Sequence, residues 1–189
     1  CAYCFYADEA SIRTVPNYGL MPREVGHALI EKAAGAAEGS ITFLFQGGEP
    51  TLAGLDFYRD FVSHVKETAP GGLAVQYAIQ TNGMLLDRDW CRFFQANRFL
   101  VGLSLDGSRA CHDRFRRDGT GKGTYDRVIK AARLLEETGV EYNVLTVVTG
   151  HLAKHIQSVF STICKGGFRF QQYIPCLDPL EETRGGQGY

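Results

Sequence analysis

Apolar and polar residues follow two different periodicities along this chain, and segments of the two kinds alternate. Short apolar runs bounded by turn residues have the length and composition of buried strands; they cover residues 41–45, 74–79, 99–103, 142–148 and 168–174. Between them, apolar residues recur every three or four positions, as on one face of a helix; these segments cover residues 22–37, 55–68, 88–96, 124–138 and 153–164. Phe5-Tyr6-Ala7-Asp8 comes after the cysteine pair, and we expect the long stretch from there to Gly19 to be irregular.

The alternation of strand and helix predicts an α/β fold with a parallel sheet and helices outside it. Polar turn residues follow the predicted strands, as in Gln80-Thr81-Asn82-Gly83 and Ser104-Leu105-Asp106-Gly107. The carboxyl ends of parallel strands meet at one edge of a sheet, and folds of this class bind their ligands there. The sequence therefore predicts a ligand site at that edge.

Composition and charge narrow the class of protein. With 189 residues and 44% apolar residues, the chain is expected to form one packed domain. Its net charge of −1 gives no basic field for nucleic acid, and no apolar run approaches the length of a membrane span. Six cysteines are too sparse for a disulfide scaffold, so we expect a reducing, cytoplasmic location. Cys91 and Cys164 lie in apolar, helix-like surroundings and are predicted to be buried and inert.

Two cysteines open the chain at a spacing that suits several kinds of site. Cys1-Ala2-Tyr3-Cys4 would serve an iron–sulfur cluster, zinc or a redox disulfide. A zinc ribbon needs a second close pair, which the sequence lacks, and a thioredoxin-like motif needs a strand before it. Gly47-Gly48 follows a predicted strand, where glycine lets backbone approach a polar ligand closely. Together these features favour an iron–sulfur centre beside a small-molecule site.

This set of motifs resembles the radical S-adenosylmethionine (SAM) superfamily. Cys1, Tyr3 and Cys4 match the last three fixed positions of its Cys-x-x-x-Cys-x-aromatic-Cys signature, and Gly47-Gly48-Glu49-Pro50 matches its methionine-binding motif. The resemblance implies a partial (β/α)6 TIM-like barrel whose first strand and first cysteine precede this chain. Residues 1–189 would then be a core domain truncated at both ends.

Longer strings resemble one family within it, the anaerobic sulfatase-maturating enzymes. The similarity covers nearly the whole chain. The matching strings are Phe43-Leu44-Phe45-Gln46-Gly47-Gly48-Glu49-Pro50-Thr51-Leu52-Ala53-Gly54-Leu55, Gln80-Thr81-Asn82-Gly83, Val101-Gly102-Leu103-Ser104-Leu105-Asp106-Gly107, His112-Asp113 with Arg116, Gly121-Lys122-Gly123-Thr124-Tyr125-Asp126-Arg127-Val128, and Gln172-Tyr173-Ile174-Pro175-Cys176-Leu177-Asp178.

The resemblance also implies roles for individual residues. Cys1 and Cys4 would ligate a [4Fe–4S] cluster. SAM would be held by Tyr3 beside the adenine, the Gly48 backbone at the methionine amino group, Ser104 at the ribose, Arg116 at the carboxylate and the Leu177 main chain at the adenine. Tyr6 and Gln46 would face a peptide substrate. Read without the resemblance, Ser104 suits a helix cap or turn, and Tyr3 and Leu177 suit packing. We expect His112 and Asp113 to support the loop that carries Arg116.

The implied function is oxidation of a cysteine or serine of a sulfatase to Cα-formylglycine. A 5′-deoxyadenosyl radical formed from SAM would abstract a hydrogen from the substrate. The implied partners are the sulfatase polypeptide and an electron donor such as ferredoxin or flavodoxin, with neither nucleic acid nor membrane. A general base and auxiliary clusters would lie beyond Tyr189. Two alternatives stay open: a radical SAM maturase that crosslinks a ribosomally made peptide, for instance by a thioether, and a non-catalytic metal-binding module.

Overall fold

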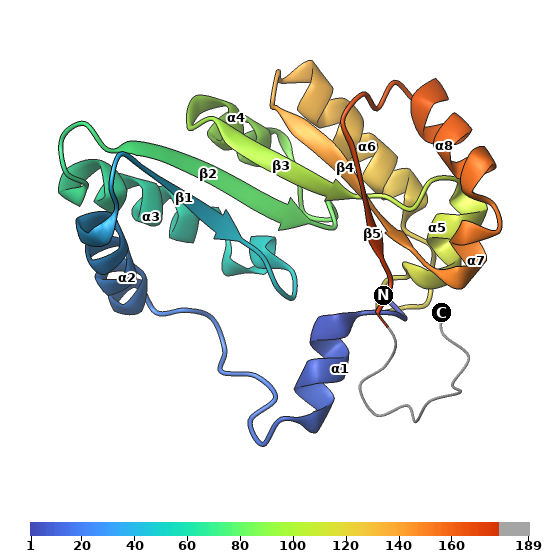
Figure 1. The fold of residues 1–189 in the computed structure, drawn as a ribbon, viewed down its shortest axis with the longest axis horizontal. Helices are drawn as coiled ribbons and strands as arrows, with labels where there is room; N and C mark the ends of the chain where they lie inside the picture. Colours follow the sequence, from blue (N-terminus) through green and yellow to red (C-terminus); the bar gives the residue numbers. More distant parts are fainter. Residues whose placement is uncertain (178–189) are drawn as a thin grey trace.

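Five parallel strands form a single curled sheet in the computed structural model, which describes residues 1–177 (Figure 1). The strands lie side by side in chain order: β1 (Ser40–Phe45), β2 (Ala74–Thr81), β3 (Phe99–Ser104), β4 (Tyr142–Val148) and β5 (Gln171–Pro175). Each crossover between them contains a helix, as parallel pairing requires. The expected α/β architecture, part of a TIM-like barrel, is confirmed.

The helices of these crossovers lie on the outer side of the sheet (Figure 1). They are α3 (Leu55–Thr68), α4 (Arg88–Ala96), α6 (Tyr125–Glu137) and α8 (Ile156–Lys165), while α2 (Arg23–Ala36) precedes β1 and packs on α3. None of the helices described is long and apolar enough to cross a membrane.

The core fills the space between the sheet and these helices, and aromatic rings make up much of it. Phe99 of β3 is 1% exposed and contacts Phe94 of α4 at a ring separation of 5.2 Å. Phe43 of β1 meets Phe61 of α3 edge to face at 5.1 Å. Burying each such ring removes a large apolar surface from water and contributes about 1.5–3 kcal/mol. This layer fixes the strands, so their carboxyl ends meet at one edge.

The inner face of the sheet is more polar, because side chains alternate between faces along each strand. Gln76 and Gln80 of β2 and Ser104 of β3 point to this side, away from the aromatic layer. A polar, partly open inner face is the side on which a barrel accommodates ligands. The arrangement therefore leaves room for a ligand inside the curl.

Near the ligand edge one expectation about helices is wrong, and one helix was not predicted. The stretch after Cys4 is not wholly irregular, because α1 spans Phe5–Ile12. The unpredicted helix, α5 (Arg109–Phe115), follows β3 and is capped by Ser108, whose hydroxyl accepts from the Cys111 amide. Helix α1 buries no residue, so it lacks the periodic apolar face by which a helix is recognised in sequence.

The last third of the chain departs from expectation in three details. The helix expected over residues 153–164 is two helices, α7 (Gly150–Ala153) and α8, with the hydroxyl of Thr149 capping the first. Strand β5 begins three residues later than the predicted position 168, since Phe168 packs in the core. Cys164 is exposed rather than buried, because Val159 and Ile163 occupy the inward face of α8; Cys91 is buried as expected.

Candidate active site

The predicted motifs gather at the carboxyl edge of the sheet, next to the start of the chain (Figure 1). The backbone amide of Ala2 donates to the carbonyl of Phe115, at the end of α5, over 2.9 Å. Cys4 then stands at the N-terminus of α1, and the Cys4 amide donates to the Cys1 carbonyl. The two cysteines therefore lie on one tight turn that is fastened to the loop after β3.

Glycines 47 and 48 make the turn after β1. Their φ angles are +102° and +58°, a region that residues with a Cβ seldom adopt. A Cβ at Gly47 would lie 3.4 Å from the ring of Tyr6, so α1 packs against this turn. A Cβ at Gly48 would meet nothing within 4 Å, which leaves its backbone open to a ligand.

Glu49 fastens the β1 turn to the end of β2. One carboxylate oxygen accepts from the amide and hydroxyl of Thr51 and from the hydroxyl of Thr81, at 2.6–3.1 Å. The other accepts from the Asn82 amide at 2.8 Å. Hydrogen bonds to a carboxylate are among the stronger ones in proteins. Glu49 thus sets the relative position of two strand ends.

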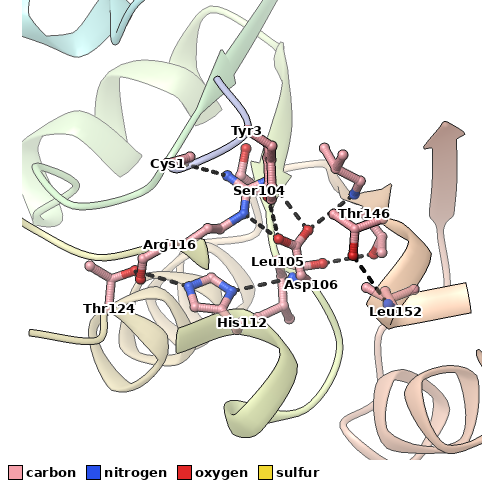
Figure 2. Close-up of polar contacts among 12 residues, drawn as sticks. Cys1, Tyr3, Ser104, Leu105, Asp106, His112, Arg116, Thr124, Thr146 and Leu152 are labelled. Carbon is pink, nitrogen blue, oxygen red and sulfur yellow. Dashed lines mark hydrogen bonds and ion pairs between the residues drawn. The ribbon is translucent and has the colours of Figure 1, made fainter. Parts of the chain in front are cut away.

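Asp106 is the central charge of the site, and it is 1% exposed (Figure 2). Its carboxylate accepts from Arg116 Nε at 2.8 Å and Nη2 at 3.3 Å, from the Val147 amide at 3.0 Å and from the Tyr3 hydroxyl. A buried carboxylate needs such partners to offset its lost hydration. Asp106 therefore joins the N-terminal turn, the loop after β3 and strand β4.

Arg116 lies between this carboxylate and the first cysteine. Its Nη1 is 3.7 Å from Cys1 Sγ, and its guanidinium sits over the Tyr3 ring at 5.4 Å. Burial alone would lower the pKa of Arg116, but Asp106 and Tyr3 outweigh it and raise the pKa above its ordinary value. Burial raises the pKa of Tyr3 as well, so Tyr3 stays a neutral donor. The site holds a permanent positive charge beside Cys1.

His112 connects the backbone of Asp106 to the backbone of Arg116 through a series of hydrogen bonds. Its Nδ1 accepts from the Asp106 amide at 3.2 Å, and its Nε2 faces the Thr124 hydroxyl at 3.0 Å. Thr124 in turn donates to the Arg116 carbonyl. Burial, helped by the charge of Arg116, lowers the pKa of His112 to about 4. Neutral His112 thus supports the Arg116 loop, as the sequence predicted, and Asp113 does so by accepting from the Tyr125 amide.

A cavity of about 290 Å³ opens beside this network. Cys1, Ser104 and Arg116, three of the predicted site residues, line it together with Glu49 and Asn82. The three come from the N-terminal turn, the end of β3 and the residue after α5, so the fold brings together positions more than 100 residues apart. The cavity combines thiol, hydroxyl and guanidinium groups.

The remaining predicted residues lie outside the lining of that cavity. Tyr3 is held by Asp106, and Gly48 lies on the β1 turn. Gln46 is exposed at the end of β1, Tyr6 is 44% exposed, and Leu177 is 60% exposed just beyond β5. Their proposed contacts with SAM or substrate stay predictions.

Asp106 and Glu49 are the residues to which sequence reasoning gave no role. Both belong to quoted motifs, and the available signal was a carboxylate within four residues of the end of an apolar run. A carboxylate at such a position must find donors or stay in water. The partners of Asp106 come from positions 3, 116 and 147, and only the assembled fold reveals them.

The cysteines at this edge suit an iron–sulfur cluster in part. Cys1 and Cys4 are free and neither is buried, whereas Cys91 and Cys111 are buried and unsuited to ligation. No group of three metal-binding side chains occurs among residues 1–177. Cys1 and Cys4 could provide two of the three thiolates that a cluster with one open iron requires. A cationic Arg116 beside Cys1 fits an anionic thiolate ligand set.

Comparison with known proteins agrees with this geometry. The sequence profile of the Radical SAM superfamily matches residues 1–163. The cysteine-type anaerobic sulfatase-maturating enzyme of Clostridium novyi (strain NT) is 42% identical over the whole chain, which covers 50% of that enzyme. The serine-type enzyme of Klebsiella aerogenes is 32% identical over 98% of the chain and 45% of that enzyme.

Solved structures also resemble this chain in fold. Native anSMEcpe with bound AdoMet and Kp18Cys peptide superposes with a TM-score of 0.91 at 40% identity, over 98% of this chain and 49% of that one. Streptococcus suis SuiB bound to precursor peptide SuiA, at 18% identity and a TM-score of 0.69, shares the fold over all of this chain and 39% of that one. The chain spans about half the length of the curated relatives it matches. With the profile covering most of its length, and with Cys1, Ser104 and Arg116 of its motifs lining one cavity, the chain belongs to the radical SAM superfamily.

Proposed function

We propose that this chain is the cofactor-binding core of an anaerobic sulfatase-maturating enzyme, which oxidises a cysteine or serine of a sulfatase to Cα-formylglycine. The observation that carries the proposal is the shared cavity of Cys1, Ser104 and Arg116 at the carboxyl edge of the sheet. It supports a site with a cluster on one side and a polar cofactor on the other. The similarity to sulfatase-maturating enzymes along the whole chain supports the choice within the superfamily.

Radical SAM membership brings a [4Fe–4S] cluster and SAM as cofactors. Cys1 and Cys4 would hold the cluster. For SAM, Arg116 would pair with the carboxylate, since Arg116 lines the cavity and its Nη1 lies toward Cys1, while Nε and Nη2 donate to Asp106. When bound, the two cofactors supply the oxidising power that removes a hydrogen atom from the β-carbon of the substrate.

The remaining contacts to SAM follow the arrangement of the strand ends. The open backbone of Gly48 would receive the amino group, and Ser104 would bind the ribose. Tyr3 and the Leu177 main chain would lie beside the adenine. The protein's own contribution is to orient the cofactor and to keep competing reactants away from it. Residues 1–189 would form this single core domain.

For a cysteine substrate the overall reaction balances without a further oxidant. The cysteine side chain, water and SAM give the aldehyde, hydrogen sulfide, methionine, 5′-deoxyadenosine and one proton. SAM thus takes up the two electrons that the β-carbon loses, and the electron that starts each turnover is recovered. Identities of 39–42% to cysteine-type enzymes against 29–32% to serine-type enzymes favour cysteine as the target.

Tyr6 and Gln46 would contact the substrate peptide, since both are exposed beside the β1 turn. A small iron–sulfur or flavin protein, such as ferredoxin or flavodoxin, would supply the first electron. Reduction of the cluster needs a donor of low potential, and the cluster needs free cysteine thiols. Both requirements support a reducing, cytoplasmic location for the protein. The likeness to SuiB extends to the fold and does not favour peptide crosslinking over sulfatase maturation.

The test uses the complete protein, reconstituted with iron and sulfide without oxygen. It is incubated with SAM, a reductant and sulfatase-derived peptides that carry either cysteine or serine at the target position. We expect 5′-deoxyadenosine and, by mass spectrometry, an aldehyde in place of the cysteine thiol, both lost in Cys1→Ala. Formation of 5′-deoxyadenosine with no change in either peptide would count against the sulfatase assignment. A colourless protein that contains zinc would contradict the proposal that the protein is a radical SAM enzyme.

A further inference from the structure

The inner face of the sheet contains a close packing arrangement around Gly102. Gln80 of β2 and Gly102 of β3 are direct partners in the parallel register. A Cβ built on Gly102 would lie 2.0 Å from Gln80 Oε1, far inside any tolerable contact. Gly102 is not among the glycines with positive φ, so its backbone does not require glycine. A glycine inside a strand costs stability, and here its effect is to leave room for the Gln80 amide.

The amide that fills this room reaches one step further along β3. Gln80 Nε2 donates to Ser104 Oγ at 3.2 Å. Ser104 is 8% exposed and lines the 290 Å³ cavity, while the Gln80 side chain passes over Gly102 to reach it. The Gln80 amide is thus held by two contacts, its packing over the Gly102 backbone and its hydrogen bond to Ser104.

This contact determines what the serine hydroxyl can offer to a ligand. A hydroxyl has one donor and two acceptor sites. When the Gln80 amide occupies one acceptor site, the O–H of Ser104 stays free to donate into the cavity. Holding the oxygen in place also removes part of the ordering cost that binding would otherwise carry.

We propose that Gln80 is a positioning residue that aims the Ser104 hydroxyl at the ribose of SAM, and that Gly102 is glycine because any side chain would displace the Gln80 amide. The inference rests on the proposed contact between Ser104 and the ribose. It adds two residues, on two strands, to the determinants of cofactor binding. Neither would touch the cofactor's reacting atoms.

The same strand provides a matched control. Gln76 is also a glutamine of β2 on the same face, and it makes a similar cross-strand hydrogen bond, accepting from the Thr42 hydroxyl at 3.2 Å. That pair is exposed and does not line the cavity. A general role of cross-strand amides in sheet stability would affect both glutamines, whereas positioning of Ser104 involves Gln80 alone.

The test measures the dissociation constant for SAM by calorimetry, on the cluster-reconstituted complete protein without reductant. Loss of one hydrogen bond predicts about 2- to 10-fold weaker binding in Gln80→Ala. Gln80→Glu should lose at least as much, because a carboxylate accepts and would turn the Ser104 hydroxyl away from the cavity. Gln76→Ala should bind SAM as the wild type does. L-methionine, which lacks the ribose, should bind equally to all of these variants.

A double variant separates positioning from simple loss of stability. Gly102→Ala should weaken SAM binding about as much as Gln80→Ala, since its methyl group displaces the amide. Once Gln80→Ala has emptied that space, adding Gly102→Ala should weaken binding no further. Additive losses would overturn the role given to Gly102. If Gly102→Ala fails to fold, judged by circular dichroism, the Gln80 variants carry the test alone.

Three outcomes distinguish failure of this inference from failure of its basis. Unchanged SAM affinity in Ser104→Ala would show that Ser104 does not bind the ribose, and the positioning role of Gln80 would then be wrong as well. Weaker binding in Ser104→Ala with wild-type binding in both Gln80 variants would overturn the positioning role and leave the ribose contact intact. Equal losses in Gln80→Ala and Gln76→Ala would also overturn it.

Discussion

Replacing Asp106 by asparagine should destabilise the chain far more than any exposed charge change. Arg116 would lose its buried counterion, and an asparagine NH2 group would face the guanidinium from which the carboxylate now accepts two hydrogen bonds. Breaking one side of a buried ion pair typically costs about 3–5 kcal/mol. Whole domains are stable by only about 5–15 kcal/mol, so the loss would be a large fraction of the total.

Urea unfolding of the wild type and of Asp106→Asn measures this loss. Trp90 reports it, because it is the single tryptophan of the sequence and lies buried against Phe94 in the core. We expect a lower midpoint at an unchanged slope, since the surface exposed on unfolding stays the same. A changed slope would mean that the substitution had altered the compactness of the native or the unfolded state, or the two-state character of unfolding.

Two controls bracket the expected effect. Tyr3→Phe removes one hydrogen bond to Asp106 and keeps the ion pair, so its midpoint should fall between those of the wild type and Asp106→Asn. Asp126→Asn breaks the exposed pair with Arg109 and should barely move the midpoint, because exposed pairs contribute little. The reasoning is refuted if Asp106→Asn unfolds at the same urea concentration as Asp126→Asn.

Three further predictions follow from the same contacts. His112 has a pKa of about 4 in the fold against 6.5 ordinarily, so the unfolded chain binds a proton at His112 more readily than the folded chain does. The free energy of unfolding should therefore fall between pH 6.5 and pH 4, by up to about 1.4 kcal/mol per pH unit. His112→Gln should flatten that pH dependence. Glu49→Gln removes one acceptor oxygen from a carboxylate with four donors and should cost about 1–3 kcal/mol in the same urea assay, whereas an unchanged midpoint would show that Thr81 and Asn82 find other partners. Iodoacetamide should label the exposed Cys164 in the native chain but not Cys91, whose burial raises the pKa of its thiol, and equal labelling of both would contradict the packing described.

Sequence periodicity located the sheet well because the outer face of its strands packs on helices and the strands read as largely apolar runs. Strand β4 has the predicted bounds, residues 142–148, and helices α3 and α4 match residues 55–68 and 88–96. The helices that periodicity missed or misplaced are those whose position does not depend on a buried apolar face. Helix α1 buries nothing and leaves no periodic trace, and the break between α7 and α8 depends on the Thr149 cap rather than on hydrophobicity.

The candidate site divides in the same way. Motif glycines and cysteines are visible in sequence because their chemistry is tied to residue type and spacing. The role of Asp106 is not visible, since its partners come from three distant segments that only the assembled sheet edge brings together. The pairing of Gln80 with Gly102 likewise depends on the register between β2 and β3, which no local pattern specifies.

The fastening of the N-terminal turn to Asp106 and Arg116 has a thermodynamic consequence for the cysteines. A group that binds Cys1 only when this turn is docked must stabilise the docked form by mass action. Stripping iron from the protein, for example by air, should therefore free Tyr3 and reduce protection of the Val147 amide from deuterium exchange, although that amide belongs to β4 and not to the cysteine turn. Oxygen damage at the metal would in this way reach strand β4 through a single carboxylate.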